Sequence, residues 1–253
     1  MGEMLSGIVI TGASSGIGQA LAELYARPGV LLALTGRDAT RLNAVAETCR
    51  QRGATVEAET VPVTDPAAMQ AFIAKVAVKS RLDLVIANAG VSGGFKAWED
   101  FDTHVRAITD VNIGGVINTV NPAVPIMVRQ RCGQIAIVAS LAGFLSMPGA
   151  GPYSSSKHFA RSYAEELRGM LAPEGVRVSA ICPGFVTSRM TARNKFPMPF
   201  LMDEQRAARI IANGLARNQG RIAFPWPMLA VIRLLAVLPY PVLDWILSRA
   251  PKK

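Results

Sequence analysis

A glycine-rich segment near the start of the chain restricts the fold more than any other feature. It reads Thr11-Gly-Ala-Ser-Ser-Gly-Ile-Gly18 and follows directly on an apolar run at residues 7–10. This order predicts a buried strand, a tight turn and the start of a helix, because glycine permits turns and close backbone approaches. The free N–H groups and the positive dipole end of that helix would face an anion such as a pyrophosphate. The spacing, G-x-x-x-G-x-G, differs from the common dinucleotide fingerprint, so a plain structural turn stays open as an alternative.

The rest of the chain alternates between apolar runs of strand length and segments of helix length. The predicted strands are residues 5–11, 30–35, 54–61, 82–88, 134–139, 176–182 and 220–224. The predicted helices are residues 16–26, 39–52, 66–79, 98–131 with a break, 153–172 and 203–217. Nearly continuous apolar strands are typical of a parallel sheet that helices cover on both faces. Right-handed crossovers then give a single Rossmann-type, doubly wound α/β fold of about seven strands.

Composition narrows the class of protein further. The chain has 253 residues, of which 50% are hydrophobic and 18% charged, enough for one large α/β domain. No uninterrupted apolar run reaches the length of about 18 residues that a membrane span requires, and the first residues lack the basic region of a signal peptide. The three cysteines, Cys49, Cys132 and Cys182, show no metal-ligand spacing. We therefore expect a cytoplasmic protein with ordinary thiols and no bound metal.

The positive charge of the chain lies almost wholly in its last quarter. Residues 189–253 hold 11 of the 27 basic residues and 3 of the 18 acidic ones, which is +8 of the net charge of +9. These basic residues are mixed with Trp, Leu, Ile, Met and Pro rather than with Gly, Ser and Tyr. That mixture argues against a nucleic-acid partner and favours an anionic membrane surface or a solvated helix face.

Polar side chains recur where the predicted sheet would present them to a ligand. Ser140 directly follows one predicted strand and Asn88 ends another, and parallel sheets bind ligands at the carboxyl ends of their strands. Tyr153 and Lys157 stand four residues apart and share one face of a helix. Asn112 is an unusual residue inside a predicted helix unless its amide makes a hydrogen bond. Each feature is weak alone, since a surface pair at a helix start would also explain Tyr153 and Lys157.

Together these elements resemble those of a classical short-chain dehydrogenase/reductase. The matching elements, in chain order, are residues 11–18, Asn88-Ala89-Gly90, Asn112, Ser140, Tyr153, Lys157 and Pro183-Gly184. Their order and spacing agree with the family over about three quarters of the chain. The resemblance implies an NAD(P)-dependent oxidoreductase acting on CH-OH groups.

The resemblance also implies a role for each catalytic residue. Tyr153 would be the general acid/base, and Lys157 would stabilise its phenolate, since a free phenol has a pKa of about 10. Ser140 would hydrogen-bond the substrate oxygen. Lys157 would also bind the nicotinamide ribose, and Asn112 would hold a water that links Lys157 to solvent. The hydride transfer is the chemistry of the cofactor.

The residues after the second predicted strand favour NADP over NAD. An NAD enzyme usually places a carboxylate there to bind the ribose diol, whereas this chain has Thr35, Gly36 and Arg37. A guanidinium suits a 2′-phosphate, and the adjacent Asp38 can cap the next helix. The cofactor-binding residues that the resemblance implies are Gly12, Ser14, Ser15, Gly16, Ile17, Gly18, Arg37, Val63, Asn88, Ala89, Gly90, Tyr153, Lys157, Pro183, Gly184, Val186 and Ser188.

Two positions depart from the family pattern. Pro62 stands where many members carry an Asp that contacts adenine, so we expect the backbone of Val63 to serve instead. Ser188 replaces a Thr that follows the Pro-Gly pair, and it keeps the hydroxyl for the carboxamide of the nicotinamide. Val186 and Thr187 are expected to add backbone contacts nearby.

The end of the chain also departs from the usual ending of the family. Residues 226–253 are apolar on nearly every face, and Pro239 and Pro241 divide them into two short helices, each too brief to span a bilayer. We therefore divide the chain into a cofactor-binding and catalytic domain, residues 1–224, and an extension, residues 225–253. Three roles stay open for the extension: a lid over the substrate cleft, a subunit interface, or a peripheral contact with a membrane.

The resulting hypothesis is an NADP(H)-dependent oxidoreductase that interconverts a secondary alcohol and a ketone or aldehyde. The apolar segment at residues 190–202, by resemblance the substrate loop, indicates a hydrophobic and even lipid-like substrate. The alternative is a non-catalytic dinucleotide-binding module that acts as a membrane-associated scaffold or redox sensor. An epimerase or dehydratase is a third possibility, although the larger substrate domain of such enzymes is absent.

Subunit contacts and the two histidines complete the expectations. The resemblance implies a homodimer or homotetramer that pairs through the predicted helix 153–172. We expect His158 to have a packing or subunit-contact role, because it points about 100° away from Lys157. His104 shows no partner in the sequence pattern, and we expect it to be exposed.

Overall fold

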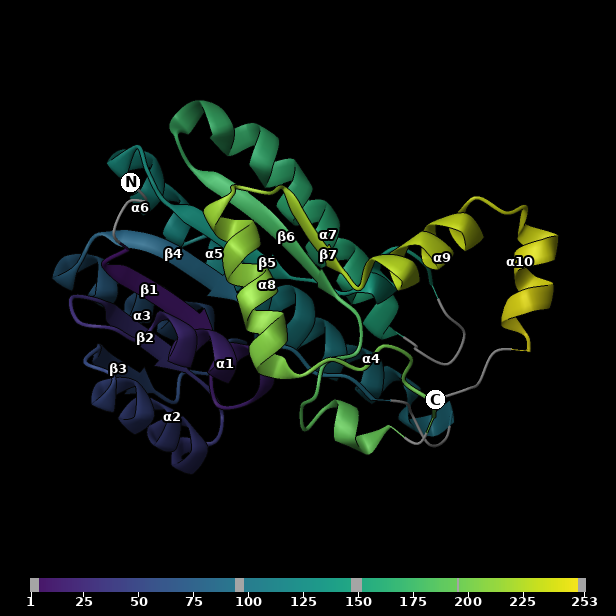
Figure 1. The fold of residues 1–253 in the computed structure, drawn as a ribbon, viewed down its shortest axis with the longest axis horizontal. Helices are drawn as coiled ribbons and strands as arrows, with labels where there is room; N and C mark the ends of the chain where they lie inside the picture. The colour runs from purple at the N-terminus through teal and green to yellow at the C-terminus, as the bar shows by residue number, and fades with distance from the viewer. Residues whose placement is uncertain (1–4, 94–97, 147–151, 195, 250–253) are drawn as a thin grey trace.

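A parallel sheet forms the centre of the computed structural model, which describes residues 5–93, 98–146, 152–194 and 196–249 (Figure 1). The seven strands follow the order β3-β2-β1-β4-β5-β6-β7. Their bounds are β1 (Gly7–Thr11), β2 (Leu31–Thr35), β3 (Thr55–Glu59), β4 (Leu82–Ala87), β5 (Gln134–Val138), β6 (Arg177–Pro183) and β7 (Arg221–Phe224). All seven predicted strands are therefore present, and the predicted Rossmann-type fold is confirmed.

Helices connect the strands in the predicted order. They are α1 (Gly16–Tyr25), α2 (Ala39–Gln51), α3 (Pro66–Lys79), α4 (Phe101–Thr109), α5 (Gly115–Val120), α6 (Ala123–Gln130), α7 (Pro152–Leu171), α8 (Glu204–Ala216), α9 (Trp226–Ala236) and α10 (Tyr240–Leu247). The predicted helix 98–131 is divided into α4, α5 and α6, with a π-helical turn, η2 (Asp110–Gly114), between α4 and α5. The side chains of Asp38 and Asp65 accept hydrogen bonds from the first turns of α2 and α3, which confirms the expected cap at Asp38.

The strands inside the sheet are largely apolar because both faces of the sheet are covered, whereas the edge strand β3 carries Glu57 and Glu59 and is only partly buried. Ile8 and Ile10 of β1 belong to a core shared with α1, α2 and α8. Val9, between them, faces a second core shared with α3, α5, α6 and α7. Successive strand residues point to opposite faces, so a strand such as β1 that is covered on both faces is apolar at nearly every position. Figure 1 shows the sheet enclosed between these two groups of helices.

The strand order reverses between β1 and β4. The chain runs outward from β1 through β2 to β3, returns to β4 on the other side of β1, and then continues to β7. Doubly wound sheets bind their ligands in the crevice at such a reversal, outside the carboxyl ends of the strands. A ligand-binding site is therefore expected among the segments that follow β1, β4, β5 and β6.

One helical stretch, Phe101–Gln130, is long and apolar enough to cross a membrane by length and composition, with a mean hydropathy of 1.3. Its apolar residues Val116, Val120 and Met127 are nevertheless buried in the core against α3, β4 and β5. It also carries the buried amide of Asn112 at the end of the sheet. We interpret this stretch as a core helix of the α/β fold.

The last two helices project beyond the end of the sheet, to the right in Figure 1. Pro239 separates α9 from α10, as the sequence predicted. Leu243 and Leu247 of α10 are buried against Leu145, which lies in the segment after β5. Partly buried residues of α9 complete this third, small apolar cluster. The two helices thus form a folded unit of their own, fixed to the molecule near the end of β5.

Candidate active site

The glycine-rich turn places α1 directly above the end of β1. Gly12 and Gly16 have φ values of +67° and +58°, in the left-handed region that favours glycine. A Cβ on Gly18 would lie 2.4 Å from the carbonyl oxygen of Gly12. The turn can therefore close only with glycine at these positions. The remaining predicted residues of this segment, Ser14, Ser15 and Ile17, lie on the turn and in the first turn of α1.

The amino end of α1 is suited to an anion. The side chain of Ser15, its N-cap residue, makes no capping hydrogen bond within the described residues. In contrast, Asp38, Asp65 and Asp203 cap α2, α3 and α8 with their carboxylates. The first N–H groups of α1 therefore keep their hydrogen-bonding capacity and their positive potential. This end of the helix fits the pyrophosphate of a dinucleotide.

Asn88 joins the turn after β1 to the end of β4. Its Nδ2 donates to the carbonyl oxygens of Thr11 at 2.9 Å and Gly12 at 3.1 Å. In return, the backbone N–H groups of Asn88 and Ala89 donate to Oγ1 of Thr11. The two strand ends at the reversal of the sheet are thus held in one rigid unit. The structure gives Asn88 a positioning role beside the predicted cofactor site.

Asn112 is held inside the molecule by the π-helical turn. Its Oδ1 accepts from the N–H of Val91 at 2.8 Å, and its Nδ2 donates to the carbonyl of Val91 at 3.0 Å and to Oγ of Ser156 at 3.0 Å. The expected hydrogen bond of this amide is therefore present. A Cβ on Gly90 would lie 3.3 Å from Oδ1 of Asn112 and 3.4 Å from Nζ of Lys157. Asn112 and Lys157 thus meet at the loop that follows β4.

Ser140 and α7 are held together by a close approach that sequence reasoning missed. Ser140 follows β5, and its Oγ accepts from the N–H of Ala142 at 3.1 Å. The short 3-10 turn after it, η3 (Leu141–Gly143), packs on α7. A Cβ on Gly143 would lie only 2.5 Å from the carbonyl oxygen of Lys157. Glycine at this position therefore decides how near Ser140 lies to the side chains of α7.

Tyr153 and Lys157 lie on the face of α7 that is turned toward this segment. Burial raises the pKa of the Tyr153 phenol, and a hydrogen bond with Ser140 partly offsets that rise. Burial also lowers the pKa of Lys157 to about 8. Nζ of Lys157 donates to the carbonyl oxygen of Val138 at 2.8 Å and lies 5.8 Å from the centroid of the Tyr153 ring. The structure therefore brings a hydroxyl, a phenol and an ammonium group together, as predicted.

The pKa of Tyr153 departs in direction from the sequence expectation. We expected the charge of Lys157 to stabilise the phenolate and so lower this pKa. In the structure the largest influence is burial, which raises it, and Ser140 is the group that lowers it. The physical reason is that a buried phenol loses hydration of its charged form, while the ammonium of Lys157 is directed at Val138.

The segment after β6 closes over the glycine-rich turn. Pro183 ends β6, and the N–H of Gly184 donates to the carbonyl of Phe224 at 2.7 Å. Val186 is buried, and Oγ of Ser188 lies 3.2 Å from Oγ1 of Thr191. A Cβ on Gly16 would lie 3.1 Å from Cβ of Ser188. These predicted residues therefore border the amino end of α1.

The polar side chain at the end of β2, Thr35, is occupied by hydrogen bonds to the backbone. Oγ1 of Thr35 donates to the carbonyl of Val61 at 2.8 Å and accepts from the N–H of that residue at 3.1 Å. Arg37, just beyond, is exposed. The carbonyl of Val63 accepts from Nδ2 of Asn118 at 2.9 Å. Thr35 is thus engaged with the segment that follows β3, and Arg37 is an exposed cationic side chain at this strand end.

Arg41 is a second cation at the same place that sequence reasoning missed. It lies in the first turn of α2, where Nη2 pairs with Asp38 at 2.9 Å. Its Nε is buried and has no hydrogen-bond partner among the described residues. With Ser14, Ser15 and Gly16 it lines a hollow of about 440 Å³. The four-residue spacing from Arg37 was the signal in the sequence, because it places both cations near one helix end.

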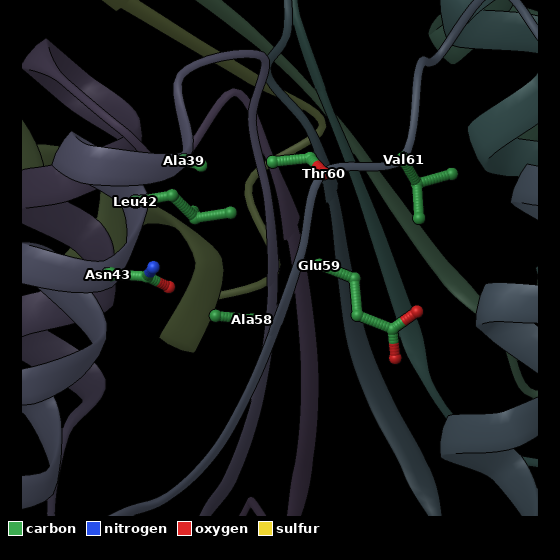
Figure 2. Close-up of a pocket in the computed structure, with 7 residues that line it drawn as sticks. All are labelled: Ala39, Leu42, Asn43, Ala58, Glu59, Thr60 and Val61. Carbon is green, nitrogen blue, oxygen red and sulfur yellow. The ribbon is translucent and has the colours of Figure 1, made fainter.

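A second hollow lies at the outer edge of the sheet. Figure 2 shows it between α2, which contributes Leu42 and Asn43, and the end of β3, where the side chain of Glu59 points away from α2. Its volume is about 410 Å³. Lys75 forms an ion pair with this carboxylate at 2.5 Å. The hollow belongs to the edge strand, and β2, β1 and β4 lie between that strand and β5, which leads to Ser140.

The structure can be compared with the expectations for the two histidines. We expected His104 to be exposed and without a partner, and this is wrong. It is only partly exposed, and its Nε2 lies 3.0 Å from the carbonyl oxygen of Gly93. That loop is distant in sequence, so the contact depends on how α4 packs. His158 lies 2.9 Å, through Nδ1, from the carbonyl of Ser154 one turn earlier.

The fold and the geometry of the site define an NAD(P)-dependent oxidoreductase. A family model described as short chain dehydrogenase matches residues 6–197. The chain belongs to this family, as its sequence motifs predicted. It is similar to an uncharacterized oxidoreductase of Myxococcus xanthus, with 41% identity over 93% of this chain and 94% of the relative.

Two solved structures resemble nearly the whole chain. One is a short chain dehydrogenase/reductase from Burkholderia phymatum in complex with NAD, with a TM-score of 0.84 and 29% identity over 98% of this chain and 97% of that one. The other is a short-chain dehydrogenase from Sphingobium yanoikuyae in complex with NADPH, with a TM-score of 0.80 and 28% identity over the same shares. The similarity therefore extends beyond the strands to the projecting C-terminal helices.

Proposed function

We propose that the protein is an NADP(H)-dependent enzyme that interconverts a secondary alcohol and a ketone or aldehyde on a hydrophobic substrate. The observation that carries the proposal is the meeting of Ser140, Tyr153 and Lys157 beside the loop that follows β4. A module that only binds a dinucleotide has no need of a phenol beside a serine hydroxyl and an ammonium group. The scaffold alternative is therefore less well supported.

The chemistry follows from the three side chains. The nicotinamide supplies or accepts the hydride. Ser140, whose Oγ already accepts from the N–H of Ala142, would donate its own hydrogen to the substrate oxygen and orient it. Tyr153 would give a proton to that oxygen in reduction and take it in oxidation, a role worth about 10²- to 10⁴-fold in rate. Lys157 would bind the ribose hydroxyls, and with the oxidised nicotinamide in place the two positive charges would together favour the phenolate.

Asn112 acts in this proposal as a positioning residue. Both ends of its amide are engaged with Val91 and Ser156, so it holds the loop after β4 against α7. Nζ of Lys157 lies at the same loop. The proposed water between Asn112 and Lys157 would complete a path for protons to solvent.

The choice of NADP rests on two cations. Arg37 is exposed just after β2, and Arg41 presents a buried Nε without a partner among the described residues. A 2′-phosphate would supply acceptors for both guanidinium groups. The hydroxyls of Ser14 and Ser15 line the same hollow as Arg41. Because Thr35 stands where a ribose-binding carboxylate would be, NAD is the less favoured cofactor.

The substrate is proposed to be apolar because of the segment after β6. Phe185 and Phe196 make an edge contact with ring centroids 5.9 Å apart. Phe200 and Leu201 are exposed nearby in sequence. Aromatic and aliphatic side chains at the border of a site favour a hydrophobic ligand.

The substitution Tyr153→Phe tests the proposal. It removes the proton donor and keeps the ring, so turnover of a panel of ketones with NADPH should fall by about 10²-fold or more. Binding of NADPH, measured by fluorescence titration, should stay within about twofold of the wild type. Unchanged turnover in this variant would refute the proposal, and a wild type that binds NADPH but reduces no ketone would favour the scaffold.

A further inference from the structure

The largest concentration of exposed apolar side chains lies in the C-terminal arm, which we define as residues 226–249. Thirteen large hydrophobic side chains are exposed in the described residues, and seven of them belong to the arm. These seven are Trp226, Val231, Leu234, Val237, Tyr240, Val242 and Trp245. Such a patch on a small part of the surface marks an interaction site.

The arm is apolar on its outer as well as its inner side. Ile232, Leu235 and Leu238 pack inward around Leu145. Val231 and Leu234, also in α9, are instead 59% and 66% exposed. A helix at the surface of a globular protein normally places polar residues there. The outer side of α9 is therefore built to enter a second apolar environment.

Aromatic side chains are combined with cations at the ends of the arm. Trp226 begins α9 and is 76% exposed, and Trp245 of α10 is 61% exposed. The guanidinium of Arg249 lies 4.2 Å from the centroid of the Trp245 ring. An amphipathic ring beside a long basic side chain suits the boundary between lipid headgroups and acyl chains.

Charge distinguishes a lipid surface from a second copy of the chain. Residues 226–253 hold Arg233, Arg249, Lys252 and Lys253 against a single acidic residue, Asp244. Two such arms in a twofold contact would bring like charges together. Residues 1–188 hold 16 basic and 15 acidic residues, so they carry no net negative charge to balance the arm. Anionic lipid headgroups supply the missing negative charge.

We propose that the C-terminal arm docks the protein on an anionic lipid surface, with Leu234 and Trp245 in the headgroup region. The arm starts beside the candidate site, because a Cβ on Gly184 would lie 2.9 Å from Cδ of Pro225 and 3.3 Å from Sδ of Met228. A docked molecule would thus hold its site close to the membrane.

Flotation of the full chain with vesicles tests the docking. The wild type should float with vesicles of phosphatidylcholine and phosphatidylglycerol, far less with phosphatidylcholine alone, and less again as salt is raised. The double variant Leu234→Ser, Trp245→Ser should lose at least about tenfold in partitioning, because it removes two inserted side chains. The control Val78→Ser, at an apolar residue that is 89% exposed on α3, should float like the wild type.

Tryptophan fluorescence and NADPH binding add two further measurements of docking and folding. Two of the three tryptophans of the chain lie in the arm, so vesicles should shift its fluorescence to shorter wavelength. NADPH binding reports whether each variant is folded. If the double variant does not fold, Arg249→Glu serves as a second variant that weakens docking. A wild type that ignores anionic vesicles at low salt overturns the proposal. So does a double variant that floats undiminished, or one whose only change is a smaller oligomer in light scattering.

Discussion

Backbone oxygens accept hydrogen bonds from two of the buried polar side chains at the candidate site. Lys157 donates to Val138 and Asn112 donates to Val91. The carbonyl of Val138 carries only a partial charge and does not offset the full charge of the Lys157 ammonium. Burial therefore destabilises the charged form of Lys157. The lowered pKa of Lys157, about 8 against its ordinary value of 10.5, expresses that cost.

The pH dependence of stability follows from this pKa. Between pH 8 and 10.5 the unfolded chain binds the proton of Lys157 more tightly than the native state, so this group makes stability rise with pH. Relative to Lys157→Met, the unfolding free energy of the wild type should therefore gain about 3 kcal/mol from pH 7 to pH 10.5. Urea denaturation of both proteins across this range measures the difference. Parallel curves would contradict the burial of a charged ammonium.

Cofactor preference is the second prediction at the residue scale. Arg37→Ala and Arg41→Ala should each weaken NADPH binding about tenfold, because each removes a charge-assisted hydrogen bond to the 2′-phosphate. Binding of NADH should change little. Arg50→Ala, an exposed arginine in the last turn of α2, is the matched control. An equal loss for both cofactors in fluorescence titrations would count against the assignment.

At the scale of elements, the contact between η3 and α7 sets the spacing of the site. The Cβ of an alanine at Gly143 would meet the backbone of Lys157 at 2.5 Å, and backbone cannot yield as a flexible side chain does. Ser140 and Tyr153 lie on the two sides of this contact. The distance between their hydroxyls therefore depends on a residue that does no chemistry.

The variant Gly143→Ala tests this dependence. It should lower stability by about 1–3 kcal/mol through overpacking, and reduce turnover more than NADPH binding. Gly169→Ala is the control within α7, because no described atom lies within 4 Å of its added Cβ. There the change should stabilise the helix by about 0.5–1 kcal/mol. Thermal unfolding and ketone reduction measure both effects, and equal behaviour of the two variants would disprove the role of Gly143.

At the scale of the whole molecule, the resemblance predicts pairing of subunits through α7. The outward residues of this helix include the stacked rings of Phe159 and Tyr163, with centroids 5.4 Å apart, and Met170, which is 62% exposed. Apolar side chains on one face of a helix suit a twofold contact.

A charge placed in this surface should dissociate the subunits. Met170→Asp would bury an unpaired carboxylate in the contact and should shift the protein toward a monomer in light scattering. Val78→Asp, at an exposed residue of α3, should leave the mass unchanged. A monomeric wild type would show that the predicted oligomer is wrong.

The sequence by itself determined the elements of this protein and their order. Residues close together in the chain determine the strands, the helix caps at Asp38 and Asp65, and the turn at Gly12. In these segments the spacing of apolar residues and the preferences of the backbone act directly. For the same reason the family motifs could be recognised at their positions. The tertiary structure decided what depends on distant residues: the engagement of Asn112 with Val91, the contact of His104, and the approach of Gly143 to α7. Packing alone brings such groups together, because their separation in space is set by the whole sheet and not by local conformation.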